Sequence, residues 1–298
     1  MTSPGKHAFP LIFCKTNDMK AILVLTDFSA AAGSAVSYAC TLSEQLKSEE
    51  IILFHSYQIP IPVSEASVFD SSTDENNIRQ TAVRDLENLE LQVRKKISAH
   101  IVTRHRTDTS ALGDINNVAQ EEGAELIVMG TTGKSRLQEI ILGSNAITVC
   151  KSSKYPVVLV PPHVSIQPAR QIVFACDMKE VEKTIPVASL KKIVDEFNLP
   201  LNILNVDDED KHFTAEMPLN AIKLYDMLTE YNPGYYNINN ENVVGGIIEF
   251  AKHEPATLVL LISKRHNFME GLFYRSLTRK LASVTPFPLL VLREKEQQ

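Results

Sequence analysis

Short apolar runs alternate with longer amphipathic stretches along most of the chain. In the first half the apolar runs are poor in Gly and Pro and typical of buried strands. We expect strands at 20–26, 51–56, 101–106, 125–129 and 156–160. Apolar residues three and four positions apart predict helices at 27–47, 73–99, 110–122 and 144–150. Strands that alternate with helices in this way predict an α/β fold with a parallel sheet covered on both faces.

The pattern then restarts after a proline-bearing linker. Gln171 to Asp177 repeats Lys20 to Asp27 in residue type. The expected strands are 171–176, 201–206, a short one near 235–236, 257–262 and 287–292, with helices ending near 197, 230 and 252. Leu126 corresponds to Leu258, and Pro156 to Pro288. The chain is therefore an internal duplication.

We divide the chain accordingly into an extension and two domains. Residues 1–18 show no helical or strand period, which predicts a flexible N-terminal extension and makes Met19 a candidate natural start. The first domain is expected over 19–162 and the second over 168–294, and each is long enough to bury its own core.

A glycine-bearing loop follows the fourth strand of the first domain. It reads Gly130-x2-Gly133-x9-Gly143-Ser144, and Ser144 is the expected cap of the next helix. Backbone N–H groups of such a loop and of a helix start can hold phosphate oxygens, and glycine allows close approach. The spacing alone fits equally well with glycines that only turn the chain. Gly133-Lys134-Ser135 does not end a P-loop, because Val128 stands where that motif needs its first glycine.

This spacing resembles the ATP-binding pattern of the universal stress protein family, and the chain as a whole resembles a tandem universal stress protein. The resemblance implies two tandem doubly wound five-stranded sheets of order 3-2-1-4-5, similar to adenine nucleotide alpha hydrolases. It implies ATP, AMP or ADP with Mg²⁺ in the first domain and a role in stress regulation. It also implies that the last strands, 156–160 and 287–292, pair and join the two domains. Whether two copies of the whole chain form a homodimer is left open at this point.

The same resemblance implies a set of nucleotide-binding residues. They are Asp27, His55 with the backbone beside it at Phe54, Gly130, Gly133, Lys134, Gly143, Ser144 and Asn145. Three of them have competing interpretations: Asp27 as a helix cap, His55 as a core histidine, and Lys134 as a solvated loop charge. If the first and fourth strands are neighbours, Asp27 and the glycine loop line one crevice.

The second domain departs from this motif. Ile262, Arg265 and Arg275 occupy the places of the three glycines, and only Ser276 keeps its counterpart, Ser144. We therefore expect no ATP site of the same kind there. The loop is basic, through Lys264, Arg265, His266, Arg275, Arg279 and Lys280, which leaves either an anion site or a solvated loop.

Composition narrows the classes of function that remain for this chain. The net charge is −6, so nucleic acid is not an expected partner. No run approaches the roughly 20 apolar residues of a membrane span. The four cysteines form no CxxC pair, and cytoplasm is the expected location. No metal-ligand spacing and no catalytic residue stands out. A nucleotide-binding regulator is favoured over a slow metal-dependent ATPase and over a structural module with an empty loop.

Overall fold

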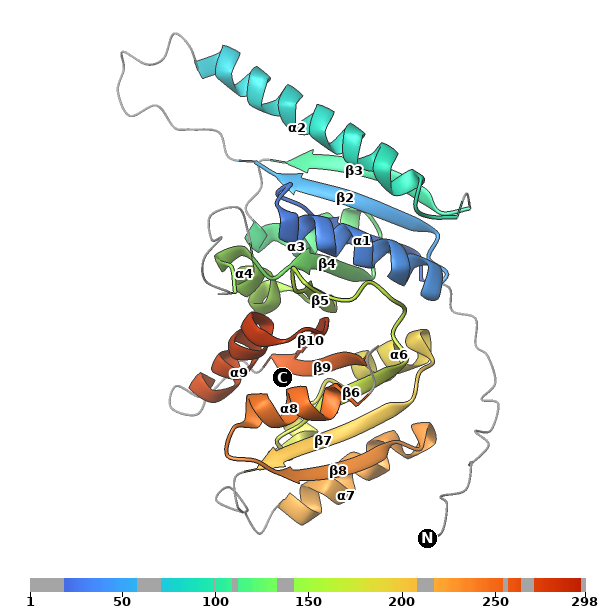
Figure 1. Cartoon of the computed structure of the whole chain (residues 1–298), viewed down its shortest axis with the longest axis vertical. Coiled ribbons are helices and arrows are strands. Elements are labelled where there is room, and N and C mark those ends of the chain that lie inside the picture. The colour runs from blue at the N-terminus through green and yellow to red at the C-terminus, as the bar shows by residue number, and fades with distance from the viewer. Residues whose placement is uncertain are drawn as a thin grey trace.

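The computed structural model describes residues 19–57, 71–98, 100–108, 112–132, 142–207, 217–253, 257–263 and 271–295. The strands form one continuous ten-stranded sheet in the order β3-β2-β1-β4-β5-β10-β9-β6-β7-β8 (Figure 1). Each half thus has the order 3-2-1-4-5, which confirms the predicted α/β fold. The two five-stranded sheets that we expected are parts of a single sheet.

The elements of the first half lie close to their expected positions. They are β1 (Ala21–Leu25), α1 (Ala30–Gln45), β2 (Glu50–Ser56), α2 (Ser71–Arg94), β3 (Val102–Asp108), α3 (Ile115–Glu121), β4 (Leu126–Gly130), α4 (Ser144–Ser152) and β5 (Val157–Val160). A 3₁₀ turn (Leu112–Asp114) precedes α3, where a single longer helix was expected. Ser29 caps α1, and its hydroxyl accepts a hydrogen bond from the N–H of Ala32.

The strands recur in the second half, but two shorter helices take the place of its first helix. Its elements are β6 (Gln171–Ala175), α5 (Val181–Thr184), α6 (Val187–Phe197), β7 (Leu201–Asp207), α7 (Met217–Leu228), β8 (Gly234–Asn239), α8 (Val243–Ala251), β9 (Thr257–Ser263), α9 (Gly271–Val284) and β10 (Leu289–Arg293). The expected single helix up to Phe197 is broken before α6. Pro186 has no backbone N–H and cannot continue a helix, so a second helix starts after it.

The two halves have equivalent strand registers. Ile22 lies opposite Leu126 in the first half, and Ile172 lies opposite Leu258 in the second. The strands β5 and β10, for which a pairing was expected, lie side by side and run antiparallel, with Val158 opposite Leu290 at the centre. Every other strand pair of the sheet is parallel. An approximate two-fold axis therefore relates the halves at this pair.

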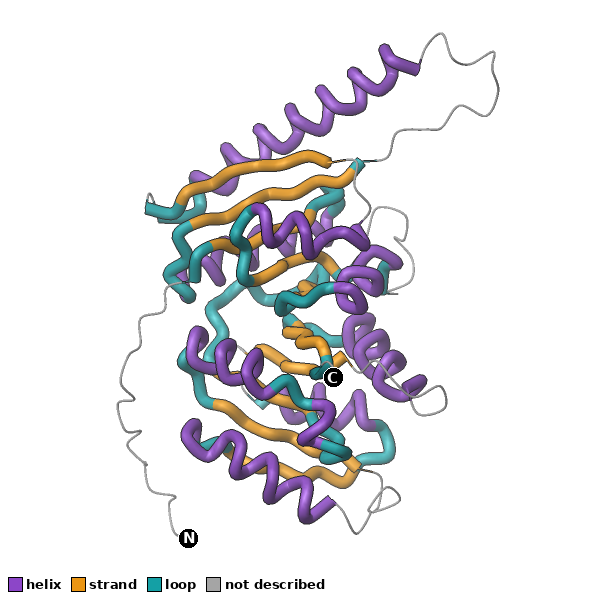
Figure 2. The backbone as a smooth tube through the Cα atoms, turned by 180° about the vertical axis from the view of Figure 1, so that it is seen from behind, coloured by secondary structure: helices purple, strands orange, loops and turns teal. Residues whose placement is uncertain are grey.

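Helices cover both faces of the sheet, as the view from behind also shows (Figure 2). Helices α1, α2, α5, α6 and α7 pack on one face, and α3, α4, α8 and α9 pack on the other. Strand residues alternate between the two cores: Ile51 and Leu53 face the α1 side, whereas Ile52 and Phe54 face the α4 side. None of the described helices is long and apolar enough to cross a membrane.

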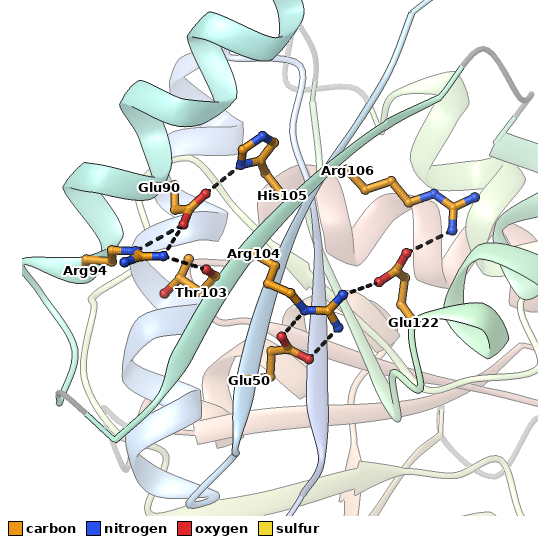
Figure 3. Close-up of polar contacts among 8 residues, drawn as sticks. All are labelled: Glu50, Glu90, Arg94, Thr103, Arg104, His105, Arg106 and Glu122. Carbon is orange, nitrogen blue, oxygen red and sulfur yellow. Dashed lines mark hydrogen bonds and ion pairs between the residues drawn. The ribbon is translucent and has the colours of Figure 1, made fainter.

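The outer strand of the first half is lined with ion pairs (Figure 3). Arg104 on β3 binds the carboxylates of Glu50 and Glu122. His105 lies on the opposite side of the strand, with its Nδ1 2.5 Å from Glu90. Charged side chains along an edge strand discourage pairing with another chain. The edge at β3 is thus protected by its own sequence.

Candidate functional site

A cavity of about 310 Å³ opens at the carboxyl ends of the central strands of the first half. It lies where β1 and β4 run side by side, with Leu25 opposite Met129, as the strand order predicted. Its walls comprise Leu25, Thr26, Asp27, Ala32, Phe54, Ser56, Leu112, Met129, Gly130, Thr131, Thr132, Gly143, Ser144, Asn145 and Ala146. This edge is where doubly wound α/β folds place their ligands.

The N-terminus of α4 forms one wall of the cavity. Gly143 is the N-cap, and its N–H donates to the carbonyl of Thr131 at 2.8 Å. Our expectation that Ser144 caps this helix is wrong, because Ser144 is its first residue. The first bond of the helix runs from the N–H of Ile147 to the carbonyl of Gly143 at 3.1 Å. The N–H groups of Ser144, Asn145 and Ala146 precede it, and no side chain caps them. Free N–H groups at a helix start can hold an anion.

Thr131 lies beside this helix start and was missed at the sequence level. It is completely buried, and its hydroxyl has no hydrogen-bond partner among the residues that the structure describes. A buried hydroxyl without a partner is costly. The sequence signal that could have identified Thr131 is its position directly after Gly130. Ser56 and Leu112 also line the cavity and were not singled out, since nothing in their local sequence marks them.

Gly130 lines the cavity with its backbone, but packing explains why it is a glycine. A Cβ at this position would come within 2.9 Å of both the carbonyl carbon and the oxygen of Ala31 on α1. Met129 faces the α4 core, so the side chain of the next residue would point to the α1 side. Ile262 holds the corresponding place on β9 and is buried. The glycine is required by the close approach of α1.

Asp27 lies at the wall of the cavity, as expected, and also stabilises the turn into α1. Its Oδ1 accepts a hydrogen bond from the N–H of Ser29 at 3.0 Å. The Thr26 hydroxyl accepts from the N–H of Phe28 at 3.0 Å, and Phe28 adopts a left-handed φ of 61°. Two successive side chains therefore hold a tight turn that presents a carboxylate to the cavity.

The side chain of His55 is not part of this wall. Its Nδ1 lies 2.7 Å from the carbonyl oxygen of Thr26, and its ring packs against Phe28 with centroids 4.6 Å apart. Because strand residues alternate, Phe54 and Ser56 reach the cavity whereas His55 faces the α1 side. This geometry matches the interpretation as a core histidine.

The remaining expected residues divide between the cavity and the part of the chain left undescribed. Gly143, Ser144 and Asn145 line the cavity. Gly133 and Lys134 lie in 133–141, outside the described residues. No group of three or more His, Cys, Asp or Glu side chains that could hold a metal ion occurs among the residues described.

The second half has the same turn after its first strand, but no helix begins at the position that corresponds to Ser144. Asp177 Oδ1 accepts from the N–H of Lys179 at 3.2 Å, as Asp27 does from Ser29, and Met178 has a φ of 54°. However, α9 begins at Gly271, so Ser276 lies inside a helix instead of at its first position. Backbone N–H groups inside a helix are already bonded and are not available to an anion.

Sequence comparison assigns the class of protein. The model of the Universal stress protein family matches residues 19–161. Universal stress protein MJ0577 of Methanocaldococcus jannaschii is 30% identical over 158 residues, which cover 47% of this chain and 94% of that protein. The chain therefore belongs to the universal stress protein family.

Solved structures agree with this fold over nearly the whole chain. A universal stress protein of Archaeoglobus fulgidus has a TM-score of 0.64 at 17% identity, covering 92% of this chain and 98% of its own. A protein of Pseudomonas aeruginosa described as functionally unknown has a TM-score of 0.57 at 14% identity, covering 94% of each chain. At these identities the likeness concerns the fold alone.

Proposed function

We propose that the first half binds an adenine nucleotide and that the chain is a nucleotide-dependent regulatory protein of the stress response. One observation carries the proposal: a single cavity joins the carboxyl end of β1, with Asp27, to the uncapped N-terminus of α4. Family membership and the spacing Gly130-x2-Gly133-x9-Gly143-Ser144 support the same ligand.

The walls suggest how such a ligand lies. Apolar side chains of Phe54, Leu112 and Met129 offer surface to a base, and the Asp27 carboxylate can accept hydrogen bonds from hydroxyl or amino groups. The free N–H groups of α4 and the dipole of the helix favour the phosphates. Lys134, in the segment outside the described residues, is proposed to neutralise phosphate charge, and Mg²⁺ is proposed to accompany ATP.

The enzymatic alternative is a slow, metal-dependent ATPase. Phosphoryl transfer needs a residue that orients the attacking water. Among the residues that the structure describes, Asp27 is the only carboxylate of the cavity wall, and its Oδ1 already accepts from the N–H of Ser29. Retention of the nucleotide without turnover therefore fits better. A structural module that binds no nucleotide is the second alternative.

The proposal includes a tandem organisation. Residues 19–162 form the nucleotide-binding domain and residues 168–294 a degenerate second domain, with residues 1–18 as an extension. The repeated strand order and the matching registers support this division. We also place the protein in the cytoplasm, since Cys40, Cys150 and Cys176 are buried free thiols. Burial raises the pKa of the Cys150 thiol to about 12.

A pair of matched substitutions tests the nucleotide site. Ser144→Asp puts a negative charge at the α4 N-terminus, which stabilises the helix but repels phosphate. Ser276→Asp introduces the same charge at the corresponding position of the second half. In calorimetric titrations with ATP and Mg²⁺, we expect one site per chain, lost in Ser144→Asp and retained in Ser276→Asp. Absence of ATP binding by the natural chain would refute the proposal, and continuous phosphate release would favour the ATPase.

A further inference from the structure

The two outer strands of the sheet, β3 and β8, occupy equivalent positions but carry different side chains (Figure 1). Phe54 on β2 corresponds to Leu204 on β7, and these two residues lie opposite Arg106 and Tyr236. In this register, Arg104, His105 and Arg106 of β3 are replaced by Gly234, Tyr235 and Tyr236 of β8. The charged side chains that protect the edge at β3 therefore have no counterpart on β8.

The backbone of β8 points outward without a partner strand. The N–H of Asn240 donates to the carbonyl of Asp207 on β7 at 2.7 Å. Because backbone groups alternate in direction along a strand, Tyr235 and Asn237 direct their N–H and carbonyl groups away from β7. Within the part of the chain that the structure describes, no strand lies on that side. Strand β8 has no proline and no charged residue, so its sequence does not oppose the addition of a further strand.

Helix α7, which lies beside this edge, adds an apolar surface to it. The side of α7 that faces α5 is polar, and Lys223 forms an ion pair there with Glu182. The outer edge patch, as we call it, consists of large side chains that are 38% to 60% exposed: Leu219, Ile222 and Tyr225 of α7 with Tyr235 and Tyr236 of β8. The ring of Tyr225 lies 5.8 Å from that of Tyr235, so the helix and the strand form one surface.

The size of the outer edge patch fits a contact between proteins. A half-exposed side chain of this size offers roughly 100 Å², so the five together offer about 500 Å². The strand edge adds to this area, and a standard interface buries about 800 Å² per partner. Among the residues described on α2, the equivalent helix of the first half, Leu91 alone is a large apolar side chain that is exposed. The apolar edge is thus specific to the second half.

We propose that β8 pairs antiparallel with β8 of a second copy of this chain, so that the ten-stranded sheets of two chains become one. In the pairing we propose, Tyr235 exchanges hydrogen bonds with Asn237 of the second copy, and Tyr236 lies opposite its own counterpart. The two-fold axis is perpendicular to the sheet and keeps each face on its own side. Helix α7 therefore packs on α7 of the second copy.

A second copy fits this surface for two reasons. A two-fold contact presents the same combination of strand edge and helix stripe from both sides, and β5 and β10 already pair antiparallel in this way inside the molecule. The net charge of −6 makes two copies repel each other, and pairing along β8 brings no charged strand residues together.

Sedimentation equilibrium of the full chain tests the association. We expect the mass of a dimer. Ile222→Arg and Tyr236→Arg each place a charge opposite its own copy and are expected to weaken the dimer by roughly tenfold or more. Leu91→Arg is the matched control, because Leu91 and Ile222 are both 58% exposed. It should leave the association unchanged. A natural chain that is monomeric up to about 1 mM, or equal weakening by the control, would overturn the proposal.

Cross-linking tests the register of the strands. Residues opposite each other in a non-hydrogen-bonded pair have Cα atoms about 4.5 Å apart, which suits a disulfide. In a Cys14→Ser chain, where the remaining cysteines are buried, oxidised glutathione is expected to convert Tyr236→Cys into a covalent dimer. Arg106→Cys, at the equivalent position of β3, should stay monomeric under the same treatment. Equal cross-linking of the two variants, or none in Tyr236→Cys, would overturn the pairing at β8.

Discussion

His55 and Asn205 make the same hydrogen bond in the two halves of the molecule. His55 Nδ1 lies 2.7 Å from the carbonyl oxygen of Thr26, and Asn205 Nδ2 donates to the carbonyl of Cys176 at 2.9 Å. Each carbonyl lies just beyond the first strand of its half, where a residue with positive φ turns the chain into a helix. An amide N–H can only donate, and a carbonyl can only accept. His55 therefore acts as a donor that stabilises the turn.

This equivalence predicts the behaviour of two substitutions. His55→Asn is expected to retain both stability and nucleotide affinity, because it reproduces the second half. His55→Leu leaves the Thr26 carbonyl without its partner and is expected to lower the free energy of unfolding by about 1–3 kcal/mol. Urea denaturation and ATP titration of both variants check this. A stable His55→Asn protein with much weaker ATP binding would show instead that the imidazole contacts the nucleotide.

Gly130 is predicted to tolerate no side chain. In Gly130→Ala the new Cβ would lie 2.9 Å from the backbone of Ala31, so α1 must shift, at a cost of about 1–3 kcal/mol. Gly33→Ala is the matched control. Gly33 lies inside α1, where an added Cβ would meet no atom within 4 Å, and this change is expected to stabilise by about 0.5–1 kcal/mol. Thermal denaturation of both variants shows whether Gly130 is required for packing against α1 or only for the approach of a phosphate. A Gly130→Ala protein of unchanged thermal stability would contradict the packing explanation.

The stability of the chain is predicted to fall between pH 4.5 and 7 through Glu196. Burial raises the pKa of this carboxyl to about 7, although Lys192 Nζ lies 3.6 Å away and lowers it. The folded state thus holds a proton that the unfolded state releases near pH 4.5. Stability is greatest below that value and decreases as the pH rises through 7, by on the order of 2 kcal/mol.

Glu196→Gln checks this contribution, because the amide cannot titrate. Urea denaturation at several pH values is expected to show a smaller decrease for Glu196→Gln than for the natural chain. Glu87→Gln, at an exposed position of α2, should keep the decrease. Identical pH profiles for the natural chain and Glu196→Gln would rule out this carboxyl as the cause.

The two halves are predicted to unfold as one unit. Val158 and Leu290 pair at the centre of the sheet, both completely buried, and one core continues through residues of both halves. Leu290→Ala is expected to cost about 2–5 kcal/mol. Calorimetry should show a single transition that moves as a whole to lower temperature. Two transitions, of which only one moves, would show that the halves unfold independently.

Sequence alone predicted the strands and the correspondence between Leu126 and Leu258, and the family resemblance implied their order within each half. Apolar runs and residue spacing are local properties, and the duplicated pattern shows the same signal twice. The family resemblance implied a site that includes Asp27, Gly143, Ser144 and Asn145, and these four residues line one cavity. Side-chain direction along a strand is also periodic, yet no sequence signal indicated which face the ligand would occupy.

Features that depend on contacts between distant segments were decided only by the tertiary structure. The approach of α1 to β4 explains Gly130, and the bond to Thr26 shows why His55 faces away from the cavity. The pairing of β5 with β10 was expected, and the structure shows that it is antiparallel and merges the two sheets into one. The break at Pro186 brings the start of α6 to the same cavity as Lys295, which lies more than a hundred positions along the chain. Local propensity cannot encode such contacts, because their energies arise from packing and hydrogen bonding between elements after the chain has folded.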